Sequence, residues 1–143
     1  LLEKSPSSRW KKVDFNTLLR SSDYISFHVH LNAKTRNMIN TKNVHLLSKK
    51  PFIINVSRAE LFEYDALVEA LEKRLIRGLG LDAHYEEPTS SNDPLLSFGN
   101  VFFSPHVAGS TVDSYSTVMS RCIENISSAI SGFKQDGMIA GAD

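Results

Sequence analysis

Several features that would each point to a particular class of protein are absent from the sequence. It holds one cysteine in 143 residues, which excludes a disulfide framework and favours a reducing compartment such as the cytoplasm. Its 16 basic and 16 acidic side chains cancel, and no block of one charge predicts a nucleic acid or a membrane surface as partner. No apolar run reaches the length of a spanning helix, and the opening LLEKSPSSRWKK is too short in its apolar part to be expected as a signal peptide. A globular chain with one core-bearing domain is therefore expected.

The pattern of apolar residues predicts strands that alternate with helices. Strict alternation marks 24–31 (YISFHVHL) as a strand, and short β-branched or aromatic runs predict further strands over 51–57, 78–84 and 100–104. Helical spacing predicts helices over 14–23, 41–50 and 65–75, and a long amphipathic helix from Thr111 to Gly132. Because helices separate successive strands, the connections are expected to be crossovers. The fold class is therefore α/β, with a parallel, doubly wound sheet.

The stretch FFSPHVAGST (102–111) ends the last predicted strand in an unusual way. Proline cannot donate to a continuing ladder, so a strand that stops at Pro105 delivers His106 at its carboxyl edge. Gly109 then relaxes the backbone, and Ser110 or Thr111 can cap the following helix. Ligands of open α/β sheets bind at such edges, although a lone His106 could also be an ordinary loop histidine.

Polar side chains stand at the carboxyl ends of all four predicted strands, and in a parallel sheet these ends share one edge. The residues are His28 and His30 in HVHL, Arg58, Asp82 with Glu87 close behind, and His106. The planar guanidinium of an arginine matches a carboxylate, and a histidine exchanges a proton with an oxygen at neutral pH. A carboxylate such as Glu87 would orient the imidazole. The set suits an anionic substrate with a carbonyl or hydroxyl beside its carboxylate.

Each of these residues also has a structural interpretation. Arg58 could pair with Glu60 on the surface, Asp82 could cap a loop, and Glu87 could be solvated in an acidic turn. Their joint appearance at strand ends favours a functional site over these separate explanations.

Four stretches resemble the D-isomer-specific 2-hydroxyacid dehydrogenases, in family order and spacing: SSDYISFHVHLNAKTRNMIN (21–40), NVSRAELFEYDALVEAL (55–71), GLGLDAHYEEP (78–88) and NVFFSPHVAGST (100–111). The resemblance implies a Rossmann-like cofactor domain, NAD or NADP as cofactor, and a small 2-keto or 2-hydroxy acid as substrate. It also implies a homodimer in the complete protein, and no nucleic acid or membrane partner.

The resemblance also assigns roles to single residues. The arginine that binds the substrate carboxylate would be Arg58, the glutamate that supports the catalytic histidine would be Glu87, and the general acid/base would be His106. Asp82 would contact the nicotinamide carboxamide. The residues that fall where the family lines the nicotinamide are Val56, Ser57, Ala108 and Gly109.

Some positions depart from the family pattern. Ala59 stands where glycine is usual and would strain a backbone with positive φ, while Ala83-His84 replaces an apolar–aromatic pair. His30 replaces the usual proline near the adenosine side of the cofactor. A metal site built from His28, His30 and His84 is only weakly indicated by the H-x-H spacing.

No G-x-G-x-x-G occurs, nor the acidic residue that follows it and binds the cofactor ribose. The chain is therefore expected to be the carboxyl-terminal part of an enzyme. On this interpretation, residues 1–110 form a partial dinucleotide-binding domain, and 111–143 form a helix that leads toward an absent substrate domain. The alternatives are a non-catalytic, dinucleotide-sensing module of the corepressor type, an inactive fragment, or a formate dehydrogenase, which Glu87 disfavours because those enzymes place glutamine there.

Two further residues are assigned to the scaffold. His45 is interpreted as a surface residue of a helix, and Cys122 lies on the apolar stripe of the last helix, where it is expected to be packed rather than reactive.

Overall fold

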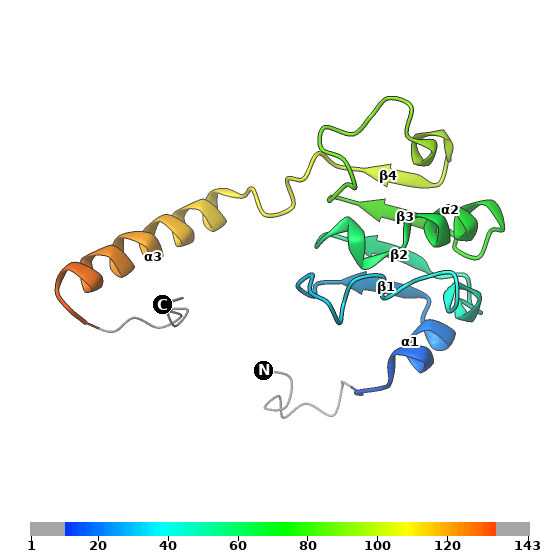
Figure 1. Ribbon diagram of the computed structural model, residues 1–143, viewed down its shortest axis with the longest axis horizontal. Helices are drawn as coiled ribbons and strands as arrows, with labels where there is room; N and C mark the ends of the chain where they lie inside the picture. Colours follow the sequence, from blue (N-terminus) through cyan, green and yellow to red (C-terminus); the bar gives the residue numbers. More distant parts are fainter. Residues whose placement is uncertain (1–10, 134–143) are drawn as a thin grey trace. The chain divides into compact units, whose positions relative to one another are not determined.

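The computed structural model of the protein describes residues 11–133. The start of the predicted cofactor segment 1–110 and the end of the predicted helical segment 111–143 therefore lie outside the described residues. Four strands form one sheet: β1 (Tyr24–Phe27), β2 (Phe52–Asn55), β3 (Gly78–Leu81) and β4 (Val101–Phe103). The strands lie side by side in the order in which they occur in the chain, and every neighbouring pair is parallel (Figure 1). This confirms the predicted parallel α/β sheet.

Helices and single turns connect the strands: α1 (Phe15–Ser21), η2 (Val44–Leu46), η3 (Ala59–Leu61), α2 (Tyr64–Glu72), η4 (Pro94–Ser97) and, after the last strand, α3 (Val112–Ile130). The helix predicted over 41–50 is wrong, since this stretch holds only the 3₁₀ turn η2. Asn43 explains the difference, because its side chain accepts from the backbone of Asn40 at 2.9 Å and donates to the carbonyl of Met38 at 2.7 Å. Such local side-chain bonds compete with helical backbone bonds.

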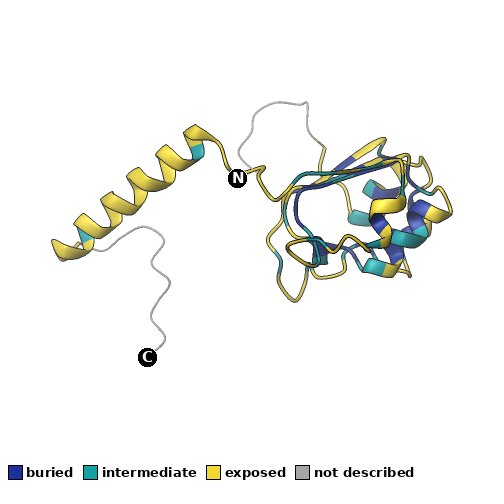
Figure 2. Ribbon diagram, turned by 90° about the horizontal axis from the view of Figure 1, so that it is seen from above, coloured by how far each residue is buried: buried dark blue, intermediate teal, exposed yellow. Residues whose placement is uncertain are grey.

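One face of the sheet is buried and the other is open. Strands β1 and β2 alternate along their length, with Ile25, Phe27 and Ile53 in the core and Tyr24 and Phe52 exposed. The core also contains residues of α1 and α2, so these helices cover the buried face (Figure 2). Right-handed crossovers between strands in sequential order place all connections on one face. The described residues thus build one half of a doubly wound arrangement.

Aromatic rings line part of the open face. The rings of Tyr24 and Phe52 stack with their centroids 5.5 Å apart, and the guanidinium of Arg77 lies 5.4 Å from the centre of the Phe52 ring. A Cβ atom on Gly78 would lie 2.9 Å from Cδ1 of Phe52. The glycine at the start of β3 therefore lets the Phe52 ring lie flat across the neighbouring strand.

The chain separates into two compact units, one ending at His106 and one beginning at Val107. In the second unit, Thr111 caps α3 and accepts from the backbone N–H of Ser114 at 3.1 Å, as predicted. Helix α3 has no buried residue, and Cys122 is exposed, so the expected packing of this cysteine is not found. Among residues 11–133, no helix combines the length and the apolar character needed to cross a membrane.

Candidate active site

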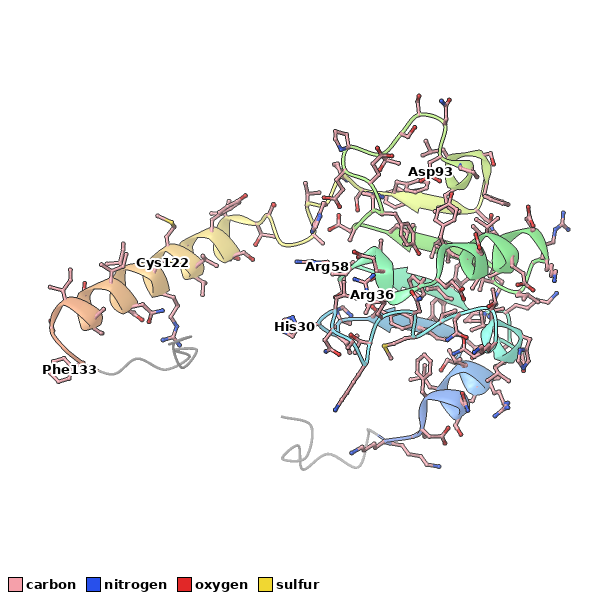
Figure 3. All side chains as sticks on the ribbon, in the orientation of Figure 1. His30, Arg36, Arg58, Asp93, Cys122 and Phe133 are labelled. Carbon is pink, nitrogen blue, oxygen red and sulfur yellow. The ribbon has the colours of Figure 1, made fainter. Side chains whose placement is uncertain are left out.

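The carboxyl ends of the strands bring the predicted polar residues of the first unit to one edge. Arg58 follows β2, Asp82 follows β3 directly, and His106 follows β4. In the register of the sheet Asn55 pairs with Leu81, and Leu81 pairs with Phe103. Figure 3 shows the Arg58 and His30 side chains extending at the same end of the sheet.

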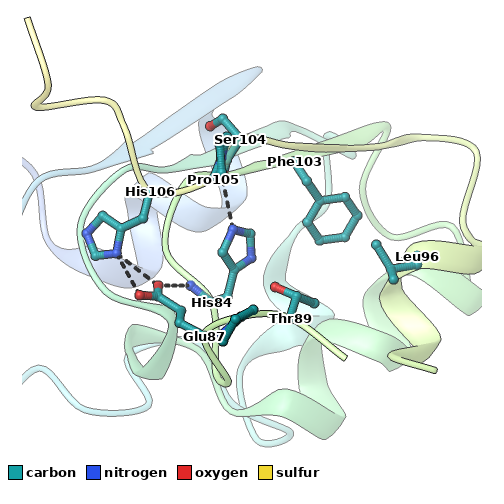
Figure 4. Close-up of a pocket in the computed structure, with 9 residues that line it drawn as sticks. His84, Glu87, Thr89, Leu96, Phe103, Ser104, Pro105 and His106 are labelled. Carbon is teal, nitrogen blue, oxygen red and sulfur yellow. Dashed lines mark hydrogen bonds and ion pairs between the residues drawn. The ribbon is translucent and has the colours of Figure 1, made fainter. Parts of the chain in front are cut away.

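The carboxylate of Glu87 holds the ring of His106. Nδ1 of His106 lies 2.9 Å from Oε1 and 3.1 Å from Oε2 of Glu87, with 42% and 44% of the two side chains exposed (Figure 4). The backbone N–H of His84 donates to the same carboxylate at 3.1 Å. This bond, followed by the one from His106, lowers the pKa of the Glu87 carboxyl below its ordinary value.

This arrangement decides where the imidazole can exchange a proton. An ionised carboxylate only accepts hydrogen bonds, so Nδ1 of His106 must carry the proton that it shares with Glu87. Nε2 is then the nitrogen left to give or take a proton at a ligand oxygen.

The backbone of His106 adopts the left-handed conformation, with φ of 55°. For a residue other than glycine this conformation costs roughly 1–2 kcal/mol. The backbone N–H of His106 bonds to the carbonyl of Ser104 at 2.9 Å across Pro105. This turn aims the imidazole toward Glu87, and nothing in the sequence motif signals the positive φ.

A buried asparagine shapes the loop that carries Arg58. Asn55 is fully buried, and its side chain accepts from the backbone of Ser57 at 3.0 Å and donates to the carbonyl of Arg58 at 2.8 Å. The hydroxyl of Ser57 in turn donates to the carbonyl of Val29, shortly after the end of β1. Sequence reasoning missed Asn55 as a positioning residue, although an asparagine that ends an apolar strand is a usable signal.

Arg58 itself is exposed, and its guanidinium donates to the carbonyl of Ser57 at 2.7 Å. No ion pair of Arg58 is found in the described part of the chain, so the alternative pairing with Glu60 is not observed. The guanidinium thus keeps donors for an anionic ligand.

Asp82 is 3% exposed, and its Oδ1 accepts from the hydroxyl of Ser104 at 2.6 Å. This bond ties the ends of β3 and β4 together. The contact of Asp82 with a nicotinamide carboxamide stays a prediction.

The remaining predicted residues fall into two groups. Val56 is exposed after β2, beside Ser57, whereas Ala108 and Gly109 belong to the second unit, in the segment before α3. Their cofactor contacts stay predictions. Ala59 begins the turn η3 and is not among the residues with positive φ, so the strain considered for this alanine is absent.

No group of three or more His, Cys, Asp or Glu side chains between residues 11 and 133 is placed to hold a metal ion. In particular, the ring of His28 bonds to the hydroxyl of Ser26 at 2.7 Å, and that of His84 to the carbonyl of Ser104 at 2.8 Å.

A cavity of about 570 Å³ lies beside the Glu87–His106 pair. Its lining is mostly apolar, from Phe103 and Leu96, with the ring of His84 and the side chain of Thr89 among its polar groups (Figure 4).

Known proteins resemble this chain over most of its length. Residues 3–108 match the family model described as D-isomer specific 2-hydroxyacid dehydrogenase, NAD binding domain. A glyoxylate reductase of Thermofilum pendens is 34% identical over 119 residues, which are 83% of this chain and 35% of that protein. A D-3-phosphoglycerate dehydrogenase of Methanocaldococcus jannaschii is 36% identical over 83% of this chain and 22% of its own length. The chain thus spans about a third of the first relative and less of the second.

Solved structures agree with these matches. The NAD-complexed D-isomer specific 2-hydroxyacid dehydrogenase of Lactobacillus delbrueckii ssp. bulgaricus is 30% identical, with a TM-score of 0.79 over 89% of this chain and 43% of that one. An acyclic imino acid reductase in complex with NADPH and D-Arg is 29% identical, with a TM-score of 0.80 over 91% of this chain and 41% of that one.

Proposed function

The chain belongs to the D-isomer specific 2-hydroxyacid dehydrogenases, whose NAD-binding domain it matches, and we propose that it is part of an oxidoreductase. This enzyme uses NAD or NADP and acts on a 2-keto or 2-hydroxy acid, and the chain carries its proton-transfer and carboxylate-binding groups. The observation that carries the proposal is the bond from His106 Nδ1 to Glu87 at 2.9 Å, at the same sheet edge as Arg58. An oriented imidazole and a guanidinium without an ion pair in the described chain are the two groups that reduction of a 2-keto acid requires from the protein.

The residues of this edge suit the nicotinamide end of such a cofactor, which when bound supplies or accepts the hydride. Val56 offers an exposed apolar side chain after β2, where Ser57 is held by its bond to Val29. We propose that Val56, Ser57, Asp82, Ala108 and Gly109 contact the cofactor. The match to NAD-bound and NADPH-bound relatives supports this assignment.

In the proposed reaction Arg58 binds the substrate carboxylate with its planar donors and helps to polarise the neighbouring carbonyl. His106 then donates the Nε2 proton to the 2-keto oxygen as hydride reaches the carbonyl carbon, which yields the 2-hydroxy acid. In the oxidative direction His106 takes the hydroxyl proton back. Glu87 stays ionised throughout and keeps the imidazole in one orientation and tautomer.

The complete protein is further proposed to be a cytoplasmic homodimer. The single cysteine is consistent with a reducing compartment, but the dimer rests on family membership alone.

The test is reductase activity of the longest natural polypeptide that contains this chain, on glyoxylate, hydroxypyruvate, pyruvate and a phosphorylated 2-keto acid. His106→Ala should lower kcat by about 10²–10⁴-fold, because it removes the general acid. His45→Ala, an exposed histidine on η2, is the matched control and should leave kcat unchanged.

Near-normal turnover of the His106→Ala variant would defeat the assignment of the general acid. Dinucleotide binding without turnover on any acid would favour the sensing module, and oxidation of formate would favour a formate dehydrogenase.

A further inference from the structure

A second histidine, His84, contacts both residues that position His106, one through its backbone and the other through its ring. Its backbone N–H donates to Oε1 of Glu87 at 3.1 Å, and its ring Nε2 lies 2.8 Å from the carbonyl of Ser104 (Figure 4). A carbonyl only accepts, so Nε2 of His84 carries a proton and donates it.

The carbonyl of Ser104 is therefore shared by two donors. The backbone N–H of His106 reaches it at 2.9 Å, from the opposite end of the turn over Pro105. The rest of Ser104 is also held, by the bond of its N–H to the carbonyl of Leu81 at 2.9 Å and by the bond of its hydroxyl to Asp82 at 2.6 Å. His84 thus completes the set of bonds that fixes the peptide group on which the turn is built.

The turn needs such support because His106 adopts a left-handed backbone, which persists in a non-glycine residue only when its surroundings impose it. The ring of His84 is half-buried and packs against Phe103, with centroids 5.7 Å apart. The rings of His84 and Phe103 both line the cavity of about 570 Å³, and their packing shields the bond of His84 to Ser104.

We propose that His84 is a positioning residue. Its ring locks the Ser104–His106 turn, and its backbone orients Glu87, so that the imidazole of His106 keeps the Nδ1–H tautomer and directs Nε2 outward. The inference concerns the geometry of His106, and it rests on the proposed function only for the consequence in turnover. The aromatic residue that is usual at this position could supply the packing of His84 but not the bond.

The experiment compares His84→Phe, which keeps an aromatic ring but cannot donate, with His84→Gln, whose amide can still donate to a carbonyl. His45→Phe is the control for losing a histidine elsewhere. The first readout is long-range ¹H–¹⁵N correlation spectroscopy of the histidine rings of the 143-residue chain at alkaline pH. It reports which nitrogen of neutral His106 carries the proton, without cofactor or substrate.

The second readout is kcat and KM of the longest natural polypeptide that contains the chain. Loss of one hydrogen bond changes an equilibrium by about three- to tenfold, so the ratio of the Nδ1–H to the Nε2–H tautomer of His106 should fall by about this factor in His84→Phe, and kcat should fall by up to the same factor. KM should change by less than about twofold, which is below the effect of losing one hydrogen bond, because Arg58 is untouched. His84→Gln should restore both values, and His45→Phe should change neither.

An unchanged tautomer in His84→Phe, or a His84→Gln variant no better than His84→Phe, overturns the role of His84 even if the enzyme is active. A tautomer shift in a protein that reduces no 2-keto acid upholds the role of His84 and refutes the proposed function instead. The two failures are therefore distinguishable.

Discussion

The loop that presents Arg58 depends on a single buried side chain, and its removal gives the sharpest test of how this edge is built. Asn55 is fully buried and makes two hydrogen bonds to the loop, from Ser57 at 3.0 Å and to Arg58 at 2.8 Å. Asn55→Ala removes both bonds and leaves the backbone N–H of Ser57 without its partner, whereas the carbonyl of Arg58 keeps the bond from the N–H of Leu61 at 3.2 Å.

Each bond contributes roughly 0.5–1.5 kcal/mol net, and the unpaired N–H of Ser57 adds to the loss, so unfolding should become easier by about 2–3 kcal/mol. With a urea slope of about 1–3 kcal/mol/M, the midpoint of unfolding should fall by about 0.7–3 M at unchanged slope. In the active protein KM for the 2-keto acid should rise more than kcat falls, because Arg58 is proposed to bind the substrate carboxylate.

Asn92→Ala is the matched control, since Asn92 is exposed in the loop before η4. Within the described residues, only its backbone N–H, and not its side chain, is found in a hydrogen bond with a side chain. Urea denaturation followed by circular dichroism compares the two variants. If Asn55→Ala unfolds within about 0.5 kcal/mol of Asn92→Ala, the size of an ordinary surface substitution, then Asn55 does not organise the loop.

Two further predictions concern Glu87 and the chain as a whole. The folded-state pKa of Glu87 lies below its ordinary value, so its stabilising contribution is present above that value and is lost as the pH falls through the folded-state pKa. The difference in unfolding free energy between wild type and Glu87→Gln should therefore be largest at neutral pH and shrink as the pH falls below the ordinary glutamate pKa of 4.5, and a pH-independent difference would contradict this linkage. Residues 1–143 alone contain no glycine-rich phosphate turn, so they should bind NADH more weakly than about 1 mM, and their exposed sheet face should promote self-association. Fluorescence titration and light scattering measure both, and micromolar binding by a monomer would be the contrary result.

The sheet could be predicted because each strand has a recognisable pattern of residues within its own short stretch of sequence. Ile25 and Phe27 alternate with polar or exposed residues, and Pro51 and Pro105 stand at strand boundaries. The amphipathic α2 between two strands then made the parallel order the natural expectation. The helix predicted over 41–50 is absent although its apolar spacing fits a helix, because the side chain of Asn43 bonds to the backbone of Asn40 and Met38 instead.

Some contacts in the candidate site could likewise be predicted from the sequence, and others could not. The pairing of Glu87 with His106 could be expected from the family motifs, and the structure places them at 2.9 Å. The left-handed backbone of His106 and the bond of His84 to Ser104 could not, because both depend on how β3 and β4 end side by side. A sequence pattern names the residues of a turn but not the carbonyl on which they converge.

The side chains that we propose to act at this edge lie in turns beyond the strands, and this explains why so many backbone atoms help to hold them. Arg58 is held through Asn55, and His106 through the carbonyl of Ser104 and the carboxylate of Glu87. The strands have only three or four residues, and their side chains mainly build the core. The precise orientation that the proposed proton transfer requires therefore has to come from side chains that bond to the loops. Because the lowered pKa keeps Glu87 ionised, that precision includes the tautomer of His106 and persists at any pH above the range in which Glu87 titrates.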